Sequence, residues 1–90
     1  MLSCFYKKTF LKDLAKLPIR IRKRIETLVF EVIPESENPF QDLDVKKMKS
    51  YQHYYRIRTG DYRIGFKMEN ADKITFYRVK SRADIYKFFP

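Results

Sequence analysis

The sequence predicts an α+β fold in which elements in the order β-α-α-β-β-β form an antiparallel sheet with a helical hairpin packed on one face. Two observations predict this class. Apolar residues recur at three- and four-residue intervals in the first third of the chain, and they alternate with polar residues in its second half. Ninety residues with 44% hydrophobic content are enough for one modest core, so residues 1–90 are expected to form a single domain.

The first third of the chain predicts one strand and two helices. Residues 2–6, LSCFY, form a short apolar run typical of a strand. Apolar residues at helical spacing follow Thr9, the expected N-cap, and Pro18 ends this helix. A second apolar stripe over residues 21–33 predicts another helix. Since neither helix can bury its stripe alone, we expect a helical hairpin against the sheet.

The rest of the chain predicts a loop, three strands and a tail. Residues 34–52 contain two prolines and no sustained period, which predicts a long loop. The three predicted strands cover residues 53–59, 61–69 and 73–79. In the last of them neither set of alternate residues is cleanly apolar, so its register stays open, and a surface position is favoured for Arg78. Residues 80–90 form a short basic and aromatic tail.

Charge and cysteine content limit the function classes. Twenty Lys and Arg residues against eleven Asp and Glu residues give a formal net charge of +9, which favours nucleic acid, an acidic protein or anionic lipid as partner. The lone Cys4 cannot form an intramolecular disulfide and is expected to be a buried structural thiol. Neither a signal peptide nor an apolar run of about 20 residues is apparent, so we expect a cytoplasmic protein without a membrane partner.

The stretch YRIRTGDYRIGF, residues 55–66, predicts a tight hairpin. Gly60 suits the first position of a two-residue type II′ turn, which requires positive φ there. The register that follows pairs Tyr55 with Phe66, Arg56 with Gly65, Ile57 with Ile64 and Arg58 with Arg63. One face of the hairpin is therefore apolar, and the other carries three guanidinium groups.

Opposed like charges such as Arg58 and Arg63 destabilise a sheet unless water or an anion surrounds them. A solvated face is one interpretation, and phosphate is the other, because planar guanidinium groups bind it well. Gly65 leaves space beside Arg56 where a bulky group could approach the backbone. If the tail folds back over the hairpin, it adds further groups to this face, namely Lys80, Arg82 and Tyr86.

The second half of the chain contains an ordered series of short motifs, namely Tyr-Arg-Ile-Arg, Gly-Asp-Tyr-Arg and Arg-x-x-x-Tyr, together with the strand ITFYRV and the closing SRADIY. This series resembles the RelE/ParE superfamily of prokaryotic toxin–antitoxin toxins, specifically its RelE-like branch. The resemblance covers essentially the full chain. It implies a metal-independent endoribonuclease, an mRNA interferase that cuts mRNA in the ribosomal A site, and a separate antitoxin that wraps the toxin. Carried over by position, the implied catalytic residues are Arg56, Arg58, Arg63, Arg82 and Tyr86.

Cleavage by the ribose 2′-OH requires proton removal, stabilisation of a charged transition state and protonation of the leaving oxygen. Arginines stabilise charge but are poor proton carriers, which leaves Tyr86 as the candidate base or as an orienting group. Two departures from the family pattern leave the acid–base roles open. Some members have lysines at Arg56 and Arg58, and many have histidine at Ser81. For the only histidine, His53, a structural or surface role is expected.

Other basic and aromatic residues surround this pattern. Phosphate contact is expected for Lys46, Lys47 and Lys49, which lead into the arginine strand, and Lys80 is a further RNA-binding candidate. The tyrosines near residue 54 are expected to pack rather than to stack on bases. No metal-ligand spacing or glycine-rich phosphate loop is present in the sequence, so we expect no metal and no small-molecule cofactor.

Two other functions stay open: a DNA gyrase inhibitor like the ParE branch, and a basic RNA- or ribosome-binding module that does not cleave. The expected partners of the leading interpretation are a cognate antitoxin, the ribosome and mRNA. The antitoxin is expected to contact the helical pair or a sheet edge, to offset positive charge and to displace the tail.

Overall fold

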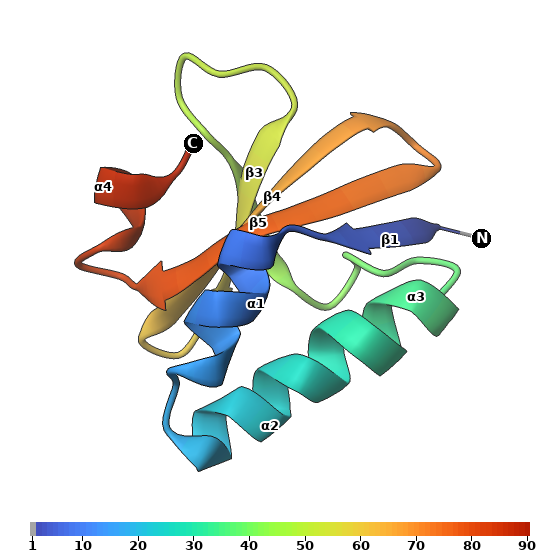
Figure 1. Cartoon of the computed structure of the whole chain (residues 1–90). Helices are drawn as coiled ribbons and strands as arrows, with labels where there is room; N and C mark the ends of the chain where they lie inside the picture. The colour runs from blue at the N-terminus through green and yellow to red at the C-terminus, as the bar shows by residue number, and fades with distance from the viewer. Residues whose placement is uncertain (1) are drawn as a thin grey trace.

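A computed structural model, which describes residues 2–90, contains one five-stranded sheet of order β1-β5-β4-β3-β2 (Figure 1). Its strands are β1 (Ser3–Tyr6), β2 (Asp44–Lys47), β3 (Tyr54–Thr59), β4 (Tyr62–Asn70) and β5 (Lys73–Ser81). The α+β class is confirmed, but the sheet is mixed, because β1 pairs with β5 in parallel and the other pairs are antiparallel. The parallel pairing places Cys4 and Tyr6 beside Ile74 and Phe76, which are buried.

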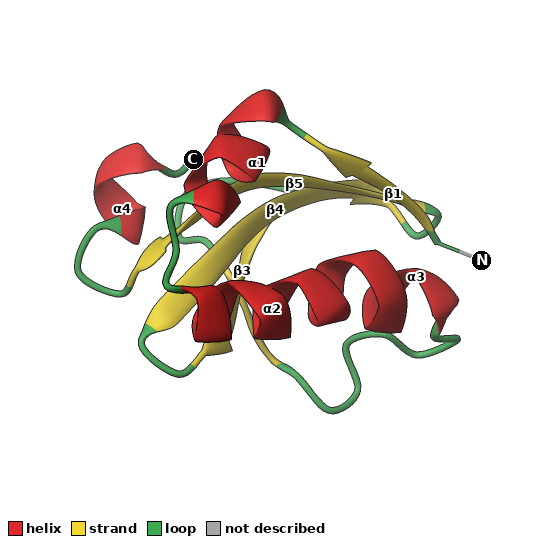
Figure 2. Cartoon of the chain, turned by 60° about the horizontal axis from the view of Figure 1, so that its bottom comes forward, coloured by secondary structure: helices red, strands yellow, loops and turns green. Residues whose placement is uncertain are grey.

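The helical pair consists of α1 (Lys8–Ala15) and α2 (Ile19–Thr27), and α2 continues without a break through a π-helical turn, η1 (Leu28–Val32), into α3 (Ile33–Glu35). Figure 2 shows α2 and α3 as one rod beneath the sheet. The expected N-cap Thr9 instead lies inside α1, where its hydroxyl donates to the Tyr77 carbonyl at 3.0 Å. The short α4 (Ile85–Phe88) follows β5. No helix in residues 2–90 is long and apolar enough to cross a membrane.

The main core lies between the sheet and the helices. Its buried residues are Phe10, Leu14, Ile25, Val29, Ile33, Ile57, Ile64, Phe66, Ile74, Phe76 and Val79. A second, smaller cluster of Met48, Ile85 and Phe89 lies apart from it, with Tyr54 and Tyr77 packed against it. Side chains on both faces of the sheet are therefore held in place.

A β-bulge at Tyr77 explains why the register of β5 could not be predicted. Phe66 pairs with Phe76 and Gly65 pairs with Arg78, so Tyr77 is the extra residue. Phe76 and Val79 are both buried although they are three residues apart. Arg78 is not a free surface residue, because its Nε lies 2.8 Å from the buried Asp13.

Strand β2 lies within the segment that the sequence predicts to be a loop. The segment has too few apolar residues to predict a strand. Of the four residues of β2, only Val45 is half-buried, and the other three are exposed. It pairs with β3 so that Asp44 lies beside Arg58 and Lys46 lies beside Arg56. Two charged residues are thereby added to the arginine face.

Candidate functional site

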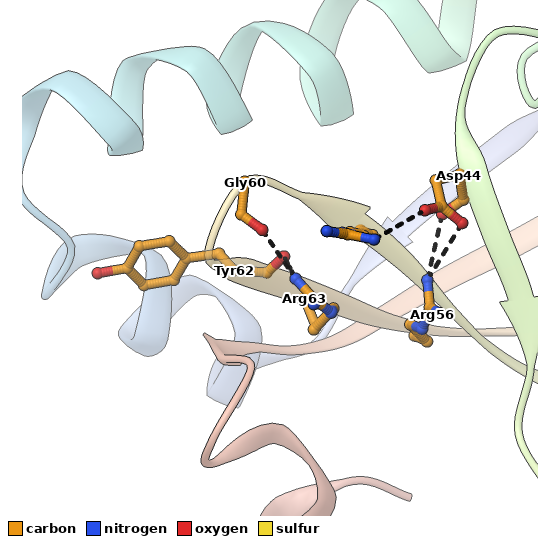
Figure 3. A network of polar contacts seen from close by, with 6 residues as sticks. Asp44, Arg56, Gly60, Tyr62 and Arg63 are labelled. Carbon is orange, nitrogen blue, oxygen red and sulfur yellow. Dashed lines mark hydrogen bonds and ion pairs between the residues drawn. The ribbon is translucent and has the colours of Figure 1, made fainter.

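The hairpin between β3 and β4 has the predicted turn and register. Gly60 has a φ of 58°, whereas Asp61 is not among the residues with positive φ, as in a type II′ turn. All four predicted cross-strand pairs are present, Arg58 with Arg63 among them. The Arg63 Nη1 donates to the carbonyls of Gly60 at 2.9 Å and Tyr62 at 3.0 Å (Figure 3). The turn thus fixes the position of one guanidinium group.

Asp44 holds the other two arginines of the hairpin. Its Oδ1 lies 3.4 Å from Arg56 Nη1, and its Oδ2 lies 3.9 Å from Arg58 Nη1 (Figure 3). The Arg56 side chain is only 13% exposed, and its buried Nε has no hydrogen-bond partner among the described residues. Sequence reasoning missed Asp44 because β2 had no strand signal that would place it beside the arginines.

The tail folds back over the hairpin, as the sequence argument requires. The Arg82 backbone N–H donates to the Asp61 carbonyl at 2.8 Å, which ties the tail to the turn. Phe89 is 2% exposed, and a Cβ at Gly65 would lie only 2.5 Å from its ring. The space expected beside Arg56 is therefore not open, because the protein's own Phe89 fills it and anchors the tail there.

The five candidate catalytic residues come together around Arg63. Burial lowers the pKa of Arg63, and the charges of Arg58, Arg56 and Arg82 lower it further, whereas Tyr86 acts in the opposite direction. The backbone agrees with this grouping: Arg58 pairs with Arg63 across the strands, and the Arg82 N–H donates to Asp61 in the turn before Arg63. Their catalytic roles stay a prediction.

A cleft of about 440 Å³ opens beside this cluster and is lined by both Arg56 and Tyr86. Tyr86 is 60% exposed, so its phenol is accessible from solvent. The predicted phosphate contacts Lys46, Lys47 and Lys49 also line this cleft, together with Met48, Tyr51, Phe89 and Pro90. The cleft combines several cations with two phenols, those of Tyr51 and Tyr86, an arrangement suited to a phosphodiester.

The remaining candidates lie elsewhere or are already paired. The Lys80 Nζ lies 3.1 Å from Asp13 Oδ1 and 4.7 Å from the centre of the Phe88 ring. His53 is exposed and has a φ of 69° just before β3. Ser81 pairs with Tyr62 at the end of β5.

The cysteine and the acidic residues do not form a metal site among the described residues. Burial raises the pKa of the half-buried Cys4 thiol. Within residues 2–90, no group of three or more His, Cys, Asp or Glu side chains is placed to hold a metal.

The comparison with known families defines the class of protein. The family model described as "ParE toxin of type II toxin-antitoxin system, parDE" matches residues 5–86. The chain therefore belongs to this family of toxins, within the RelE/ParE superfamily, and its function is that of a type II toxin.

The individual relatives lie on the RelE side of the superfamily. Toxin RelE3 of Methanocaldococcus jannaschii is 46% identical over 91 residues, which is 99% of this chain and 100% of the relative. The RelB-RelE antitoxin-toxin complex from Methanococcus jannaschii contains a chain that is 46% identical, with a TM-score of 0.78 and coverage of 96% of this chain and 99% of that one. The archaeal RelE-RelB complex from Pyrococcus horikoshii OT3 gives 25% identity, a TM-score of 0.70 and coverage of 90% and 94%.

Proposed function

We propose that this toxin is a ribosome-dependent endoribonuclease that cleaves mRNA in the ribosomal A site. The observation that supports the proposal is that the hairpin pairing, the Asp44 contacts and the Arg82 hydrogen bond gather four arginines on one face, beside a cleft lined by Arg56 and Tyr86. Guanidinium groups from two strands and a tail can bind one phosphate from several sides.

In the proposed reaction, the ribose 2′-oxygen attacks the adjacent phosphorus. A P–O bond to the 2′-oxygen forms while the bond to the 5′-oxygen of the next nucleotide breaks, which leaves a cyclic phosphate and a free 5′-hydroxyl. The arginines stabilise the negative charge of the transition state, so the mechanism requires no metal. Tyr86 orients the 2′-OH or, as its phenolate, accepts the proton of that group, and the departing 5′-oxygen takes its proton from water.

The site has no side chain suited to protonate the leaving oxygen, and the proposed reaction therefore depends on the ribosome to position the mRNA. Arg56 and Arg58 are poor proton donors, and Ser81 does not replace a histidine, so protonation of the leaving oxygen is not assigned to a side chain. Positioning of the mRNA by the ribosome lowers the barrier through orientation of the reacting groups. Ribosome and mRNA are therefore the proposed partners in the reaction.

A cognate antitoxin is the third proposed partner. The solved complexes of the relatives from Methanococcus jannaschii and Pyrococcus horikoshii are both antitoxin–toxin complexes. A net charge of +9 favours an acidic antitoxin. We propose that it contacts the helical pair or a sheet edge.

The decisive experiment is induction of the protein in bacterial cells, followed by mapping of mRNA 5′ ends. We expect cuts within codons of translated messages, and their loss in Arg82→Ala and Tyr86→Phe. Arg20→Ala is the matched control, because Arg20 is exposed on α2. Cuts that persist in both site variants would contradict the assigned roles.

The match to the ParE family model makes gyrase inhibition the second candidate function. The same induced cells distinguish it. Supercoiling defects with intact messages would support gyrase inhibition, whereas ribosome binding with intact RNA and DNA would indicate a module that does not cleave.

A further inference from the structure

A second basic hollow lies on the sheet away from the arginine cleft. It has a volume of about 150 Å³ and is lined by Lys7, Lys67, Glu69, Lys73, Thr75 and Tyr77. These residues come from β4 and β5, except Lys7, which directly follows β1. None of them belongs to the site described above.

The hollow and the arginine cleft lie on the same face of the sheet. Ile64 and Phe66 of β4 are buried in the main core, so Arg63, Gly65 and Lys67 point to the opposite face. Four residues of strand separate Arg63 from Lys67, which corresponds to about 14 Å at about 3.4 Å per residue. The Phe89 ring covers Gly65 between them, so an extended polyanion of a few nucleotides reaches both places by passing over this ring.

The hollow has more positive than negative charge. Lys67 Nζ lies 2.6 Å from Glu69 Oε1, and among the described residues neither Lys7 nor Lys73 has a carboxylate within ion-pair distance. Their ammonium groups lie against rings instead: Lys7 Nζ is 5.2 Å from the centre of the Tyr77 ring, and Lys73 Nζ is 4.9 Å from that of Phe5. Two unneutralised cations thus remain beside a polar hollow.

The lining also offers hydroxyl donors. Thr75 contributes a hydroxyl, and burial raises the pKa of Tyr77, so its phenol stays protonated at neutral pH. A volume of 150 Å³ corresponds to about five waters at about 30 Å³ each, enough for one phosphate group. The half-buried Tyr54 and Tyr77 rings, 5.9 Å apart, lie next to the hollow and pack on Phe89, which holds this wall of the hollow in place.

We propose that the hollow formed by Lys7, Lys67 and Lys73 binds a backbone phosphate of RNA, as a second contact outside the arginine cleft. This inference rests on the proposed function, because it takes RNA as the ligand of this face. An acidic protein segment could use the same charges, but the shared face with the arginine cleft favours one continuous strand.

The test compares two variants of equal charge. Lys7→Gln with Lys73→Gln removes two cations of the hollow, and Lys12→Gln with Lys16→Gln removes two exposed cations of α1 and its C-cap. The probes are a labelled single-stranded RNA with 2′-O-methyl groups, which cannot be cleaved by 2′-OH attack, and ribosomes carrying mRNA. Dissociation constants are measured over a series of salt concentrations.

We expect the hollow variant to bind about tenfold more weakly than the control, with a salt slope reduced by about 0.7, the value for one lost phosphate contact on a single strand. Lys7→Arg with Lys73→Arg should retain affinity because it keeps both charges. Equal binding by hollow and control variants, or no RNA binding by the wild type, would overturn the proposal. So would a loss confined to antitoxin binding, which would assign the hollow to a protein partner.

The same variants separate this inference from the proposed function. RNA binding that depends on the hollow in a protein that makes no cuts in cells would support the inference and contradict the nuclease proposal. If cuts persist while the hollow and control variants bind RNA equally, the result would support the nuclease proposal and contradict the inference about the hollow.

Discussion

At the scale of single residues, Asp44 places a negative charge where the proposed phosphate binds. Its carboxylate lies within 4 Å of both Arg56 and Arg58. It therefore keeps two guanidinium groups together and at the same time reduces their net charge.

Asp44→Asn should strengthen RNA binding at low salt by about fivefold, since one unit charge at about 4 Å in water is worth about 1 kcal/mol. The measurement is the dissociation constant of the uncleavable RNA. Asp42→Asn, a change at another exposed acidic residue, is the control. Weaker binding by Asp44→Asn would show that alignment of the arginines matters more than repulsion.

Asp13 is the buried acidic residue of the core and is 5% exposed. It accepts hydrogen bonds from Arg78 Nε at 2.8 Å and from the Val79 N–H at 3.2 Å, and it pairs with Lys80. Asp13→Ala should destabilise the fold by about 1–3 kcal/mol, because it leaves the buried Val79 N–H and two partly exposed cations, Arg78 and Lys80, without their partner. Chemical denaturation measures this loss, and Asp42→Ala should show almost none.

At the scale of elements, the π-helical turn η1 depends on Tyr6. The turn directs the Ile33 N–H to the Leu28 carbonyl, and Pro34 cannot serve the next carbonyl, that of Val29, because it has no N–H. The Tyr6 hydroxyl donates to that carbonyl at 2.6 Å. The strand thus completes the hydrogen bonding of the helix.

Tyr6→Phe should destabilise the protein by about 1–3 kcal/mol by leaving this carbonyl without a partner.

Tyr6→Phe should also change how the free energy of unfolding depends on pH under alkaline conditions. Burial, with a smaller effect of Cys4, raises the pKa of Tyr6 to about 12, above the value of about 10 in an unfolded chain. The wild type should therefore lose stability as pH rises from about 10 towards 12, because the unfolded state releases the proton first. Unfolding free energies over this range should fall less steeply in Tyr6→Phe.

The contact between Gly65 and Phe89 joins β4 to the tail. Gly65→Ala places a methyl group against the Phe89 ring and should displace the tail, and Tyr86 with it. We expect faster proteolysis after residue 81 and weaker cleavage of mRNA, while the main core stays folded. Ala83→Gly, at an exposed tail residue, is the control. An unchanged digestion pattern in Gly65→Ala would contradict the anchoring role of Phe89.

The local hairpin could be predicted from sequence, and its long-range surroundings could not. Gly60 and the alternation around Ile57 and Ile64 fix the turn and the register, because both depend on neighbouring residues. The position of Asp44 depends on an edge strand stabilised by β3 rather than by its own sequence. The Tyr77 bulge and the contact of Phe89 with Gly65 depend on residues more than ten positions apart, which periodicity does not detect.

At the scale of the whole molecule, one sheet face carries two basic places, the arginine cleft and the lysine hollow, with Phe89 packed on Gly65 between them. If at least three phosphates are bound there, the logarithm of the ribosome-binding constant should fall with the logarithm of salt concentration with a slope of about −2 or steeper. Co-sedimentation with ribosomes at several salt concentrations measures this slope. A slope near zero would exclude phosphate contacts as the basis of binding.

The alternation of side chains along β3 and β4 has a further consequence. Ile57 and Ile64 fill the core, and their immediate neighbours Arg56, Arg58 and Arg63 lie on the opposite face of the sheet, where Arg56 lines the cleft. Inserting or deleting one residue in either strand would exchange the two sets, turning isoleucines to water and guanidinium groups inward. Such length variants should lose folding and toxicity together, whereas replacement of single arginines should abolish toxicity in a folded protein.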